Sequence, residues 1–228
     1  MLKYRITSIR QLAPDTNAYS LKPLQEKLDF TAGEFLMLHI LDDEGNSIVK
    51  RSYSIASSPD DEEIELCIKL VNGELTSKLA KLQEGAVVGV EKGGSYFTYN
   101  GEDKCGFIAG GTGMAPVIGI LRTVAKRNIK GEFVFFCSSR TRDNILYKKE
   151  LEDLGKTNPG IKVIHTLTRE KWEGECGRVD DEMIKKYIPD VSGFSWWICG
   201  SMAMLKSMKE HLISLGSDPK KIRMEGWG

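Results

Sequence analysis

The 228-residue sequence has no long apolar run, since its densest apolar stretch, residues 133–137, has only the length of a β-strand. A membrane-spanning helix needs roughly 18 or more apolar residues, so no membrane insertion is expected. The first ten residues contain Lys3, Arg5 and Arg10 and lack the apolar core of a secretory signal. These absences together favour a cytoplasmic protein.

An excess of charge of one sign is missing as well, because 32 Lys and Arg residues balance 32 Asp and Glu residues. Nothing in the charge therefore indicates nucleic acid or an anionic membrane surface as a partner. The five cysteines contain no C-x-x-C pair, and the three histidines have no metal-ligand spacing. The sequence thus predicts no metal site and no iron–sulfur cluster, and most of the thiols are expected in the core.

The first hundred residues alternate short apolar segments with turn residues. Residues 63–69 (E-I-E-L-C-I-K) alternate with a period of two, which is typical of a half-buried strand. Six short strands at this spacing predict an antiparallel barrel, interrupted by a short helix over residues 76–82. The expected strands cover residues 3–9, 18–22, 35–41, 49–55, 63–70 and 86–91.

From about residue 104 the pattern changes, because strand candidates now alternate with helical segments. This alternation predicts a Rossmann-like parallel sheet with helices on both faces. A linker near residues 100–103 divides the chain into two expected domains, 1–101 and 102–228. The expected strands cover residues 106–109, 133–138, 162–168, 195–199 and 221–225, and the expected helices 116–127, 143–154, 180–187 and 201–215.

A glycine-rich turn, G-G-T-G-M-A-P at residues 110–116, joins the first strand of this half to its first helix. Such a turn lets a phosphate approach the backbone, and the helix N-terminus offers free N–H groups to an anion. Pro116 stands where the usual third glycine would be. A tight strand-to-helix turn without a ligand is therefore the alternative interpretation.

The next strands end in hydroxyl and guanidinium groups, with no acidic residue after Phe136 until Asp143. In dinucleotide-binding folds an acid here binds the ribose 2′-hydroxyl, whereas an arginine accommodates a 2′-phosphate. The pattern predicts NADPH, and a set of solvated arginines is the alternative. The residues expected at the phosphate are Ser139, Arg140, Thr168, Arg169 and Arg178.

The chain resembles the ferredoxin–NADP reductase superfamily, whose members pair an FAD-binding barrel with a nucleotide-binding α/β domain. The resemblance covers nearly the whole chain and depends on four motifs in the family's order. These are R-S-Y-S at 51–54, G-E-L-T at 73–76, the glycine turn at 110–116 and C-G-S-M at 199–202. The resemblance implies FAD and NADP(H) as cofactors, with NAD(H) as an open alternative.

The first two motifs carry the flavin contacts that the resemblance implies. Arg51 would pair with the FAD pyrophosphate, Tyr53 would lie against the isoalloxazine ring, and Ser54 would hydrogen-bond near flavin N5. Ser52 stands where the family often has proline. The family's G-P-x-G-x-F loop has lost its proline at residues 92–97, so no role is assigned there. The further FAD contacts implied are Lys69, Gly73, Leu75, Thr76, Thr112 and Trp227.

The resemblance implies Ser54, Cys199 and Glu225 as catalytic residues, and the last two stand near the C-terminus. Cys199 would approach the nicotinamide C4 and give shape and polarity, because no histidine is placed to act as its base. Trp227 would stack on the flavin, and a frayed terminus is the alternative. The implied NADP contacts are Gly111, Thr112, Gly113, Ser139, Arg140, Thr168, Arg169, Arg178, Cys199, Gly200 and Met202.

The resemblance implies hydride transfer between NADPH and FAD, followed by release of single electrons. The acceptor would be a separate carrier such as ferredoxin or flavodoxin, or a small molecule. One alternative is an NADH-dependent reductase of the cytochrome b5 reductase or oxygenase-reductase type. An alternative of another class is a non-catalytic nucleotide-binding regulatory subunit.

Overall fold

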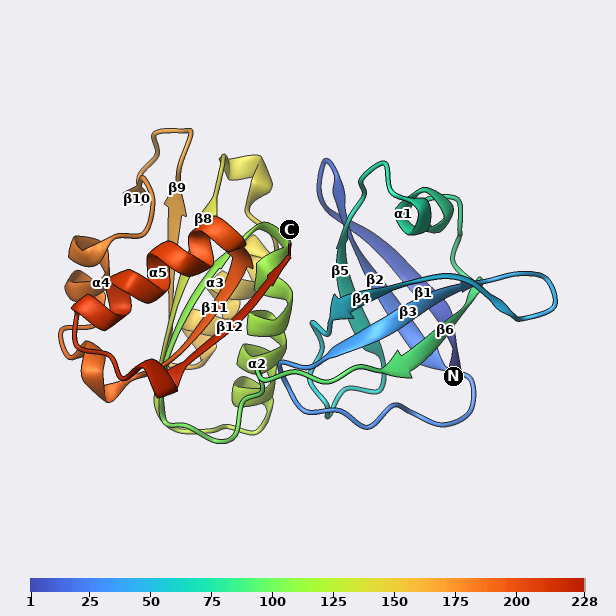
Figure 1. Ribbon diagram of the computed structural model, residues 1–228, viewed down its shortest axis with the longest axis horizontal. Helices are drawn as coiled ribbons and strands as arrows, with labels where there is room; N and C mark the ends of the chain where they lie inside the picture. The colour runs from blue at the N-terminus through green and yellow to red at the C-terminus, as the bar shows by residue number, and fades with distance from the viewer. Residues whose placement is uncertain (228) are drawn as a thin grey trace.

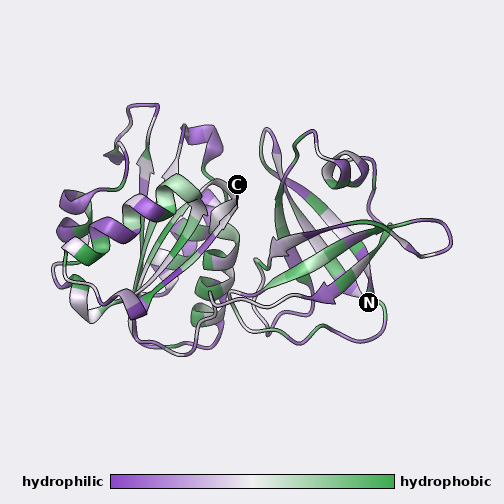
Figure 2. Cartoon of the chain, viewed as in Figure 1, coloured by the Kyte–Doolittle hydropathy of each residue, from purple (hydrophilic) through white to green (hydrophobic). Residues whose placement is uncertain are grey.

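The chain folds into two units, each built around one six-stranded sheet (Figure 1). The computed structural model describes residues 1–227, and for Trp227 it describes the backbone but not the side chain. Figure 2 shows that apolar residues concentrate in the strands and in the first helix of the second unit, whereas the connecting loops are largely hydrophilic. Both units therefore have their own apolar core.

The N-terminal unit is an antiparallel barrel, which confirms the prediction from the alternating pattern. Its strands follow the order β4-β3-β6-β1-β2-β5, and a bridge between Ile55, directly after β4, and Leu66 of β5 brings the outer strands together. Side chains such as Tyr4, Ile6 and Leu36 fill the interior. The elements are β1 (Leu2–Ala13), β2 (Thr16–Pro23), β3 (Phe35–Leu41), β4 (Ser47–Ser54), β5 (Ile64–Lys69), α1 (Glu74–Leu79) and β6 (Val87–Lys92).

The C-terminal unit is a parallel sheet, as predicted, with the strand order β10-β9-β8-β7-β11-β12. Helices α2 and α3 cover one face, and α4 and α5 cover the other. The order reverses between β7 and β11, and such a switch point opens a crevice at the carboxyl ends of the strands. The elements are β7 (Lys104–Gly110), α2 (Met114–Lys126), β8 (Glu132–Ser139), α3 (Lys148–Thr157), β9 (Ile161–Leu167), β10 (Glu175–Cys176), α4 (Asp181–Tyr187), β11 (Ser195–Ser201), α5 (Met202–Ser214) and β12 (Ile222–Trp227).

Two local elements differ from the sequence prediction. The two-residue strand β10 was not expected, because so short a segment has no periodicity. The helix expected over residues 143–154 begins only at Lys148, because the preceding Tyr147 has a left-handed φ of 54°. This conformation accompanies a ring that lies 5.2 Å from the guanidinium of Arg122 and 5.6 Å from that of Arg10. Long-range contacts of this kind override local helix propensity.

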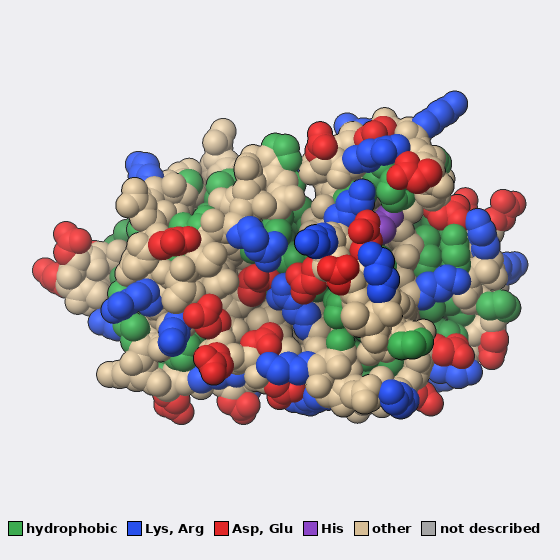
Figure 3. All heavy atoms as spheres, turned by 180° about the vertical axis from the view of Figure 1, so that it is seen from behind, with side chains coloured by type: hydrophobic (Ala, Val, Ile, Leu, Met, Phe, Trp, Pro, Cys, Tyr) green, Lys and Arg blue, Asp and Glu red, His purple; other side chains and the backbone are tan. Residues whose placement is uncertain are grey.

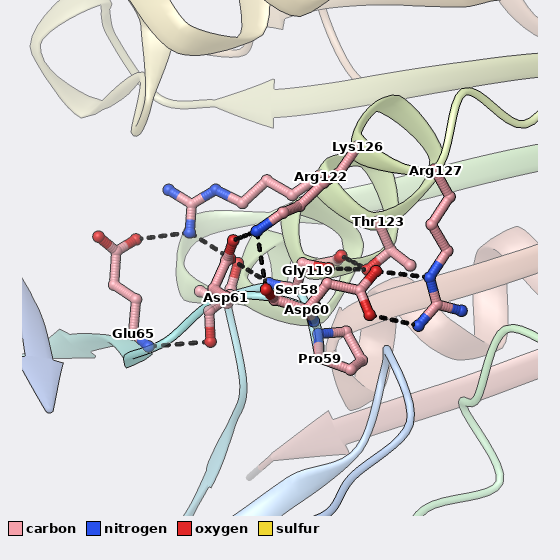
Figure 4. A network of polar contacts seen from close by, with 12 residues as sticks. Ser58, Pro59, Asp60, Asp61, Glu65, Gly119, Arg122, Thr123, Lys126 and Arg127 are labelled. Atoms are coloured by element: carbon pink, nitrogen blue, oxygen red, sulfur yellow. Dashed lines mark hydrogen bonds and ion pairs between the residues drawn. The ribbon is translucent and has the colours of Figure 1, made fainter. Parts of the chain in front are cut away.

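A network of polar contacts joins the two units along one side of α2 (Figure 4). The Arg122 guanidinium reaches the Glu65 carboxylate of the barrel at 2.9 Å and the Ala56 carbonyl at 2.8 Å. Its Nε also pairs with Glu150 of α3 at 2.6 Å. Burial opposes the charge on Arg122, but the carboxylates of Glu150 and Glu65 outweigh burial and raise the pKa of Arg122. This arginine is thus held between both units.

The last turn of α2 continues this network onto an acidic turn of the barrel. Arg127 forms a bidentate ion pair with Asp60, with N–O distances of 2.6 and 2.8 Å. Lys126 Nζ lies 2.9 Å from Asp61 Oδ1. The units therefore meet through charge as well as apolar packing. We define the interunit clamp as Ser58, Asp60, Asp61, Glu65, Arg122, Thr123, Lys126 and Arg127.

The surface carries charges of both signs. On the face seen from behind, Lys and Arg side chains are interspersed with Asp and Glu side chains (Figure 3). This distribution fits the formal net charge of zero. None of the helices within residues 1–227 has both the length and the apolar character needed to cross a membrane.

Candidate active site

A cleft with a volume of about 610 Å³ lies between the barrel and the α/β unit. The ends of β4 and β5 and the loop into α1 form its barrel wall, and the glycine turn, the start of α2 and β12 form the other. Of the ten residues predicted to bind FAD, nine line this interunit cleft, and the side chain of the tenth, Trp227, lies outside the described part of the chain. The nine are Arg51, Ser52, Tyr53, Ser54, Lys69, Gly73, Leu75, Thr76 and Thr112.

The lining combines cationic and aromatic side chains. Arg51 and Lys69 bring two positive charges to the cleft, and Lys69 is paired with Asp15 at 2.8 Å. Tyr53 and Phe35 add aromatic surface. Burial raises the pKa of Tyr53 to about 12, so the phenol stays neutral at physiological pH. This combination suits a ligand that has both a pyrophosphate and a planar ring.

A hydrogen bond joins the two walls of the cleft, because the Ser54 hydroxyl donates to Glu225 Oε1 at 2.6 Å. Glu225 lies on β12, directly opposite Cys199 of β11 in the sheet register. Cys199 is fully buried and lies outside the lining of the cleft. Burial, followed by the charge of Glu225, raises the pKa of the Cys199 thiol. A thiol held protonated is a poor nucleophile, which is compatible with the expected role in shape and polarity.

The glycine turn faces open space on one side and packs tightly on the other. Gly111 has a φ of +57°, and no heavy atom lies within 4 Å of the position its Cβ would take. Gly113 is buried, and a Cβ there would collide with the Cys199 carbonyl of β11. The turn thus leads directly from the switch point into the 13-residue helix α2. Exposed backbone at the start of such a helix favours an anion.

A second cavity of about 530 Å³ lies at the carboxyl ends of β8 and β9, beside α4 and α5. Two residues predicted for the nucleotide, Thr168 and Arg178, line it. Asp180 and His211 line it as well, and His211 Nδ1 lies 2.6 Å from Asp181 Oδ1. The lining of the cavity therefore includes both a guanidinium, that of Arg178, and a carboxylate, that of Asp180. We refer to it as the nucleotide cavity.

Other residues predicted for the phosphate lie outside the lining of the nucleotide cavity. Ser139 is buried, and its Oγ donates to the Asn144 carbonyl at 3.3 Å. The neighbouring Ser138 lines the cavity instead, because successive side chains of a strand point to opposite faces. Arg140 is exposed, and its carbonyl accepts the N–H of Arg169 at 2.9 Å. Of the predicted phosphate set, Thr168 and Arg178 thus line the cavity, Arg140 and Arg169 are exposed outside its lining, and Ser139 is buried on the opposite face of β8.

The C-G-S-M motif forms the turn from β11 into α5. Ser201 caps the helix by accepting the N–H of Met204 at 3.4 Å, and it also lines the nucleotide cavity. Gly200 is buried, and Met202 is 63 % exposed. The motif therefore stands at the switch point, on the side of the crevice opposite the glycine turn.

Several residues that line the cleft were missed by the sequence reasoning. Cys67 was expected to be a core residue, but the alternation along β5 places it on the same face as Lys69. That periodicity is a signal that could have identified it. Two of the other missed residues, Glu74 and Ala115, lie within the motifs at 73–76 and 110–116 but were given no contact, and the remaining three lie outside the four motifs. These three are Phe35, Val71 and Gly226.

Known proteins share both halves of the sequence. Residues 3–99 match the oxidoreductase FAD-binding domain family, and residues 107–210 match the oxidoreductase NAD-binding domain family. The chain is 30 % identical to NADH-cytochrome b5 reductase 1 of Lodderomyces elongisporus, over 96 % of this chain and 76 % of that protein. It is 26 % identical to the reductase subunit of an aromatic O-demethylase from Amycolatopsis sp., over 96 % of this chain and 67 % of that protein.

A solved structure has the same fold. The FAD/NAD-binding domain of nitric oxide dioxygenase from Vibrio cholerae matches with a TM-score of 0.89 at 18 % identity, over 100 % of this chain and 98 % of that chain. The fold, the two cavities and the family matches define a two-domain oxidoreductase that binds a flavin and a nicotinamide dinucleotide. The chain belongs to the ferredoxin reductase-like FAD/NAD(P)-binding oxidoreductase superfamily, which confirms the resemblance.

Proposed function

We propose that this chain is an electron-transfer reductase of the NADH-cytochrome b5 reductase or oxygenase-reductase type. It takes a hydride from a reduced nicotinamide dinucleotide onto FAD and passes single electrons to a separate carrier. The observation that carries the proposal is the interunit cleft, where nine predicted FAD contacts lie together and Ser54 bonds to Glu225 across the units. Relatives named NADH-cytochrome b5 reductase 1 and aromatic O-demethylase, reductase subunit, each match over 96 % of the chain.

The interunit cleft suits FAD in charge and in size. Arg51 and Lys69 supply cations for the pyrophosphate, and Tyr53 and Phe35 supply aromatic surface for the ring. The volume of about 610 Å³ lies within the roughly 300–1,000 Å³ that is usual for cofactor sites. We therefore assign the cleft residues named above to FAD binding, with Ser54 and Glu225 at the reacting edge.

The protein's own contribution to the reaction is orientation and exclusion of water. Bound FAD supplies the hydride-accepting and single-electron chemistry. The glycine turn and the start of α2 would hold the phosphates of the nicotinamide nucleotide, and they adjoin the cleft because Thr112 and Ala115 line it. The Ser54 hydroxyl is fixed by its bond to Glu225, so its lone pairs are free to face the cleft. Alignment of this kind supplies a large part of the acceleration expected for hydride transfer.

We propose NADH as the preferred donor. Asp180 in the nucleotide cavity is an acceptor suited to a ribose hydroxyl. It comes later in the chain than the acid that usually marks NAD binding at the end of the second strand, so it would replace that acid as the ribose partner. NADPH is the second candidate, because Arg178 and Thr168 line the same cavity and suit a 2′-phosphate. The two candidates differ in one phosphate group, so kcat/KM measured with both nucleotides decides between them.

The test uses purified protein reconstituted with FAD. A visible flavin spectrum is expected, followed by anaerobic bleaching of the flavin within milliseconds to seconds of mixing with NADH. Re-oxidation by cytochrome b5 or a ferredoxin would then identify the carrier class. Protein that binds FAD but is bleached by neither nucleotide would refute the proposal. Protein that binds no FAD at all would instead support a non-catalytic nucleotide-binding subunit.

A further inference from the structure

Glu225 has a second hydroxyl partner, which comes from the loop over residues 92–97, to which the sequence analysis assigned no role. The Ser95 hydroxyl, in the loop after β6, donates to Glu225 Oε2 at 2.8 Å. Ser54 donates to Oε1 of the same carboxylate at 2.6 Å. Both oxygens of a carboxylate on β12 are therefore held by hydroxyls of the barrel unit. The two hydroxyls come from two separate segments of that unit.

The Ser95 hydroxyl is fixed both as a hydrogen-bond acceptor and as a donor. The backbone N–H of Phe97 donates to Ser95 Oγ at 2.8 Å, so the oxygen is occupied as an acceptor. A hydroxyl has a single proton, and the proton of Ser95 is directed to Glu225. Phe97 is itself buried, and its carbonyl accepts the indole N–H of Trp197 at 2.9 Å. Ser95 is thus anchored to a rigid part of the interface.

Ser95 acts on the cleft indirectly. It contacts Glu225, which lines the cleft, but Ser95 itself does not line it. With both oxygens bound, the carboxylate cannot turn without breaking a charge-assisted hydrogen bond. If Ser95 is removed, Glu225 keeps one donor and can rotate away from Ser54. The position of the Ser54 hydroxyl therefore depends on Ser95.

We propose that Ser95 is a positioning residue for the hydride-transfer site. It fixes Glu225, and through Glu225 it fixes the Ser54 hydroxyl that faces the cleft. The same bond ties the loop over residues 93–97 to the C-terminal strand β12 across the two units. This inference rests on the proposed function for its kinetic consequence, but the tie itself can be tested independently.

The kinetic test compares Ser95→Ala with Ser95→Thr, which keeps a hydroxyl. Stopped-flow reduction of the flavin at saturating nucleotide is expected to slow about tenfold in Ser95→Ala, because small misplacements of site groups are costly in rate. The dissociation constant for FAD should stay within about twofold, since Ser95 does not itself line the cleft. Ser95→Thr should restore most of the rate. Thr98→Val removes a hydroxyl from the same loop that makes no side-chain hydrogen bond within residues 1–227 and serves as the matched control.

The structural test needs no bound flavin. Tyr96 is 97 % exposed, so chymotrypsin can cleave after it once the loop loosens. Ser95→Ala and Glu225→Ala should each accelerate this cleavage about tenfold in the apoprotein, and Thr98→Val should not. Wild-type flavin reduction and cleavage rates in Ser95→Ala would overturn the inference. Failure of the wild type to reduce its flavin would instead refute the proposed function while the proteolysis still tests the tie.

Discussion

Arg178 and Asp180 place opposite charges in the same nucleotide cavity, two residues apart in the sequence. A guanidinium favours a 2′-phosphate, and a carboxylate favours a free ribose hydroxyl. Asp180 is also the N-cap of α4, where its side chain accepts the N–H of Met183 at 2.9 Å. Its carboxylate is therefore held in place by the helix that it caps, whereas no side-chain hydrogen bond of Arg178 is found within residues 1–227. The choice between NADPH and NADH therefore depends on whether the 2′ position of the bound nucleotide contacts Arg178 or Asp180.

Replacement of Arg178 by alanine separates these contributions. KM for NADPH is expected to rise about tenfold, because a charge-assisted hydrogen bond to phosphate is worth about 1.5–3 kcal/mol. KM for NADH should change less than about twofold, since NADH carries no 2′-phosphate. Arg140→Ala is the control, because Arg140 lies outside the cavity lining. Equal changes for both nucleotides would show that Arg178 does not contact the phosphate.

The five cysteine thiols differ sharply in solvent exposure, so their reactivity tests the structure at single residues. Cys176 is exposed, and the other four are buried. Burial raises the pKa of Cys67 and of Cys137 to about 12, and it raises that of Cys199 as well. The thiolate fraction of these groups at pH 8 is therefore very small.

Alkylation of the native protein with iodoacetamide at pH 8 should modify Cys176 alone, with the other thiols reacting only after unfolding. Peptide mass spectrometry after brief labelling identifies the site. Cys176→Ser should remove the fast-reacting thiol and serves as the control. Rapid modification of Cys199 in the folded protein would show that its thiol is accessible, contrary to the structure.

At the element scale, the last turn of α2 depends on ionised carboxylates of the barrel. The hydrogen bond to Arg127 lowers the pKa of Asp60 below its usual value near 3.8. A carboxyl group whose pKa falls on folding stabilises the native state above its unfolded pKa. That stabilisation is lost as the pH falls through the lower, folded value. The Asp60 side chain is 36 % exposed, so solvent screening keeps its contribution below about 1 kcal/mol.

Asp60→Asn should therefore lower Tm slightly at pH 7, and the Tm difference should shrink as the pH falls below 3.8 through the lower folded-state pKa of the wild-type carboxyl group. Thermal unfolding followed by circular dichroism across this range gives the difference between the two proteins at each pH. Asp153→Asn is a suitable control, because its exposed pair with Lys156 lies within α3 and away from the interface. A Tm difference that is the same at pH 3 and pH 7 would contradict the assignment.

Most helices and strands, and part of the candidate site, could be predicted from the sequence. The alternation over residues 63–69 and the strand–helix order after residue 104 predicted both sheets, because periodicity is a local property. The motifs likewise predicted nine cleft residues. The break at Tyr147 could not be predicted, since it depends on Arg10 and Arg122, which are distant in the sequence. Phe35 was missed for the same reason, because its neighbours at the site come from other segments. Ser95 was missed because the family loop at residues 92–97 lacks its proline and was therefore assigned no role.

At the scale of the whole molecule, hydride transfer requires the two units to keep a fixed relation. The interunit clamp, the bond from Ser54 to Glu225 and the bond from Trp197 to the Phe97 carbonyl all cross the interface. Contacts shared between two units make their unfolding cooperative. The protein should thus unfold in one calorimetric transition, with calorimetric and van't Hoff enthalpies in agreement.

Arg122 is the residue on which this coupling should depend most. Its side chain is only 16 % exposed and lies between Glu65 of the barrel and Glu150 of α3. In Arg122→Gln these carboxylates would face each other without a cation, which costs about 3–5 kcal/mol for a buried pair. We expect the calorimetric transition to broaden or split into two, because the barrel and the α/β unit then unfold with different stabilities. Lys156→Gln removes an exposed ion pair and should leave one transition. A single, unshifted transition in Arg122→Gln would mean that apolar packing alone couples the two units.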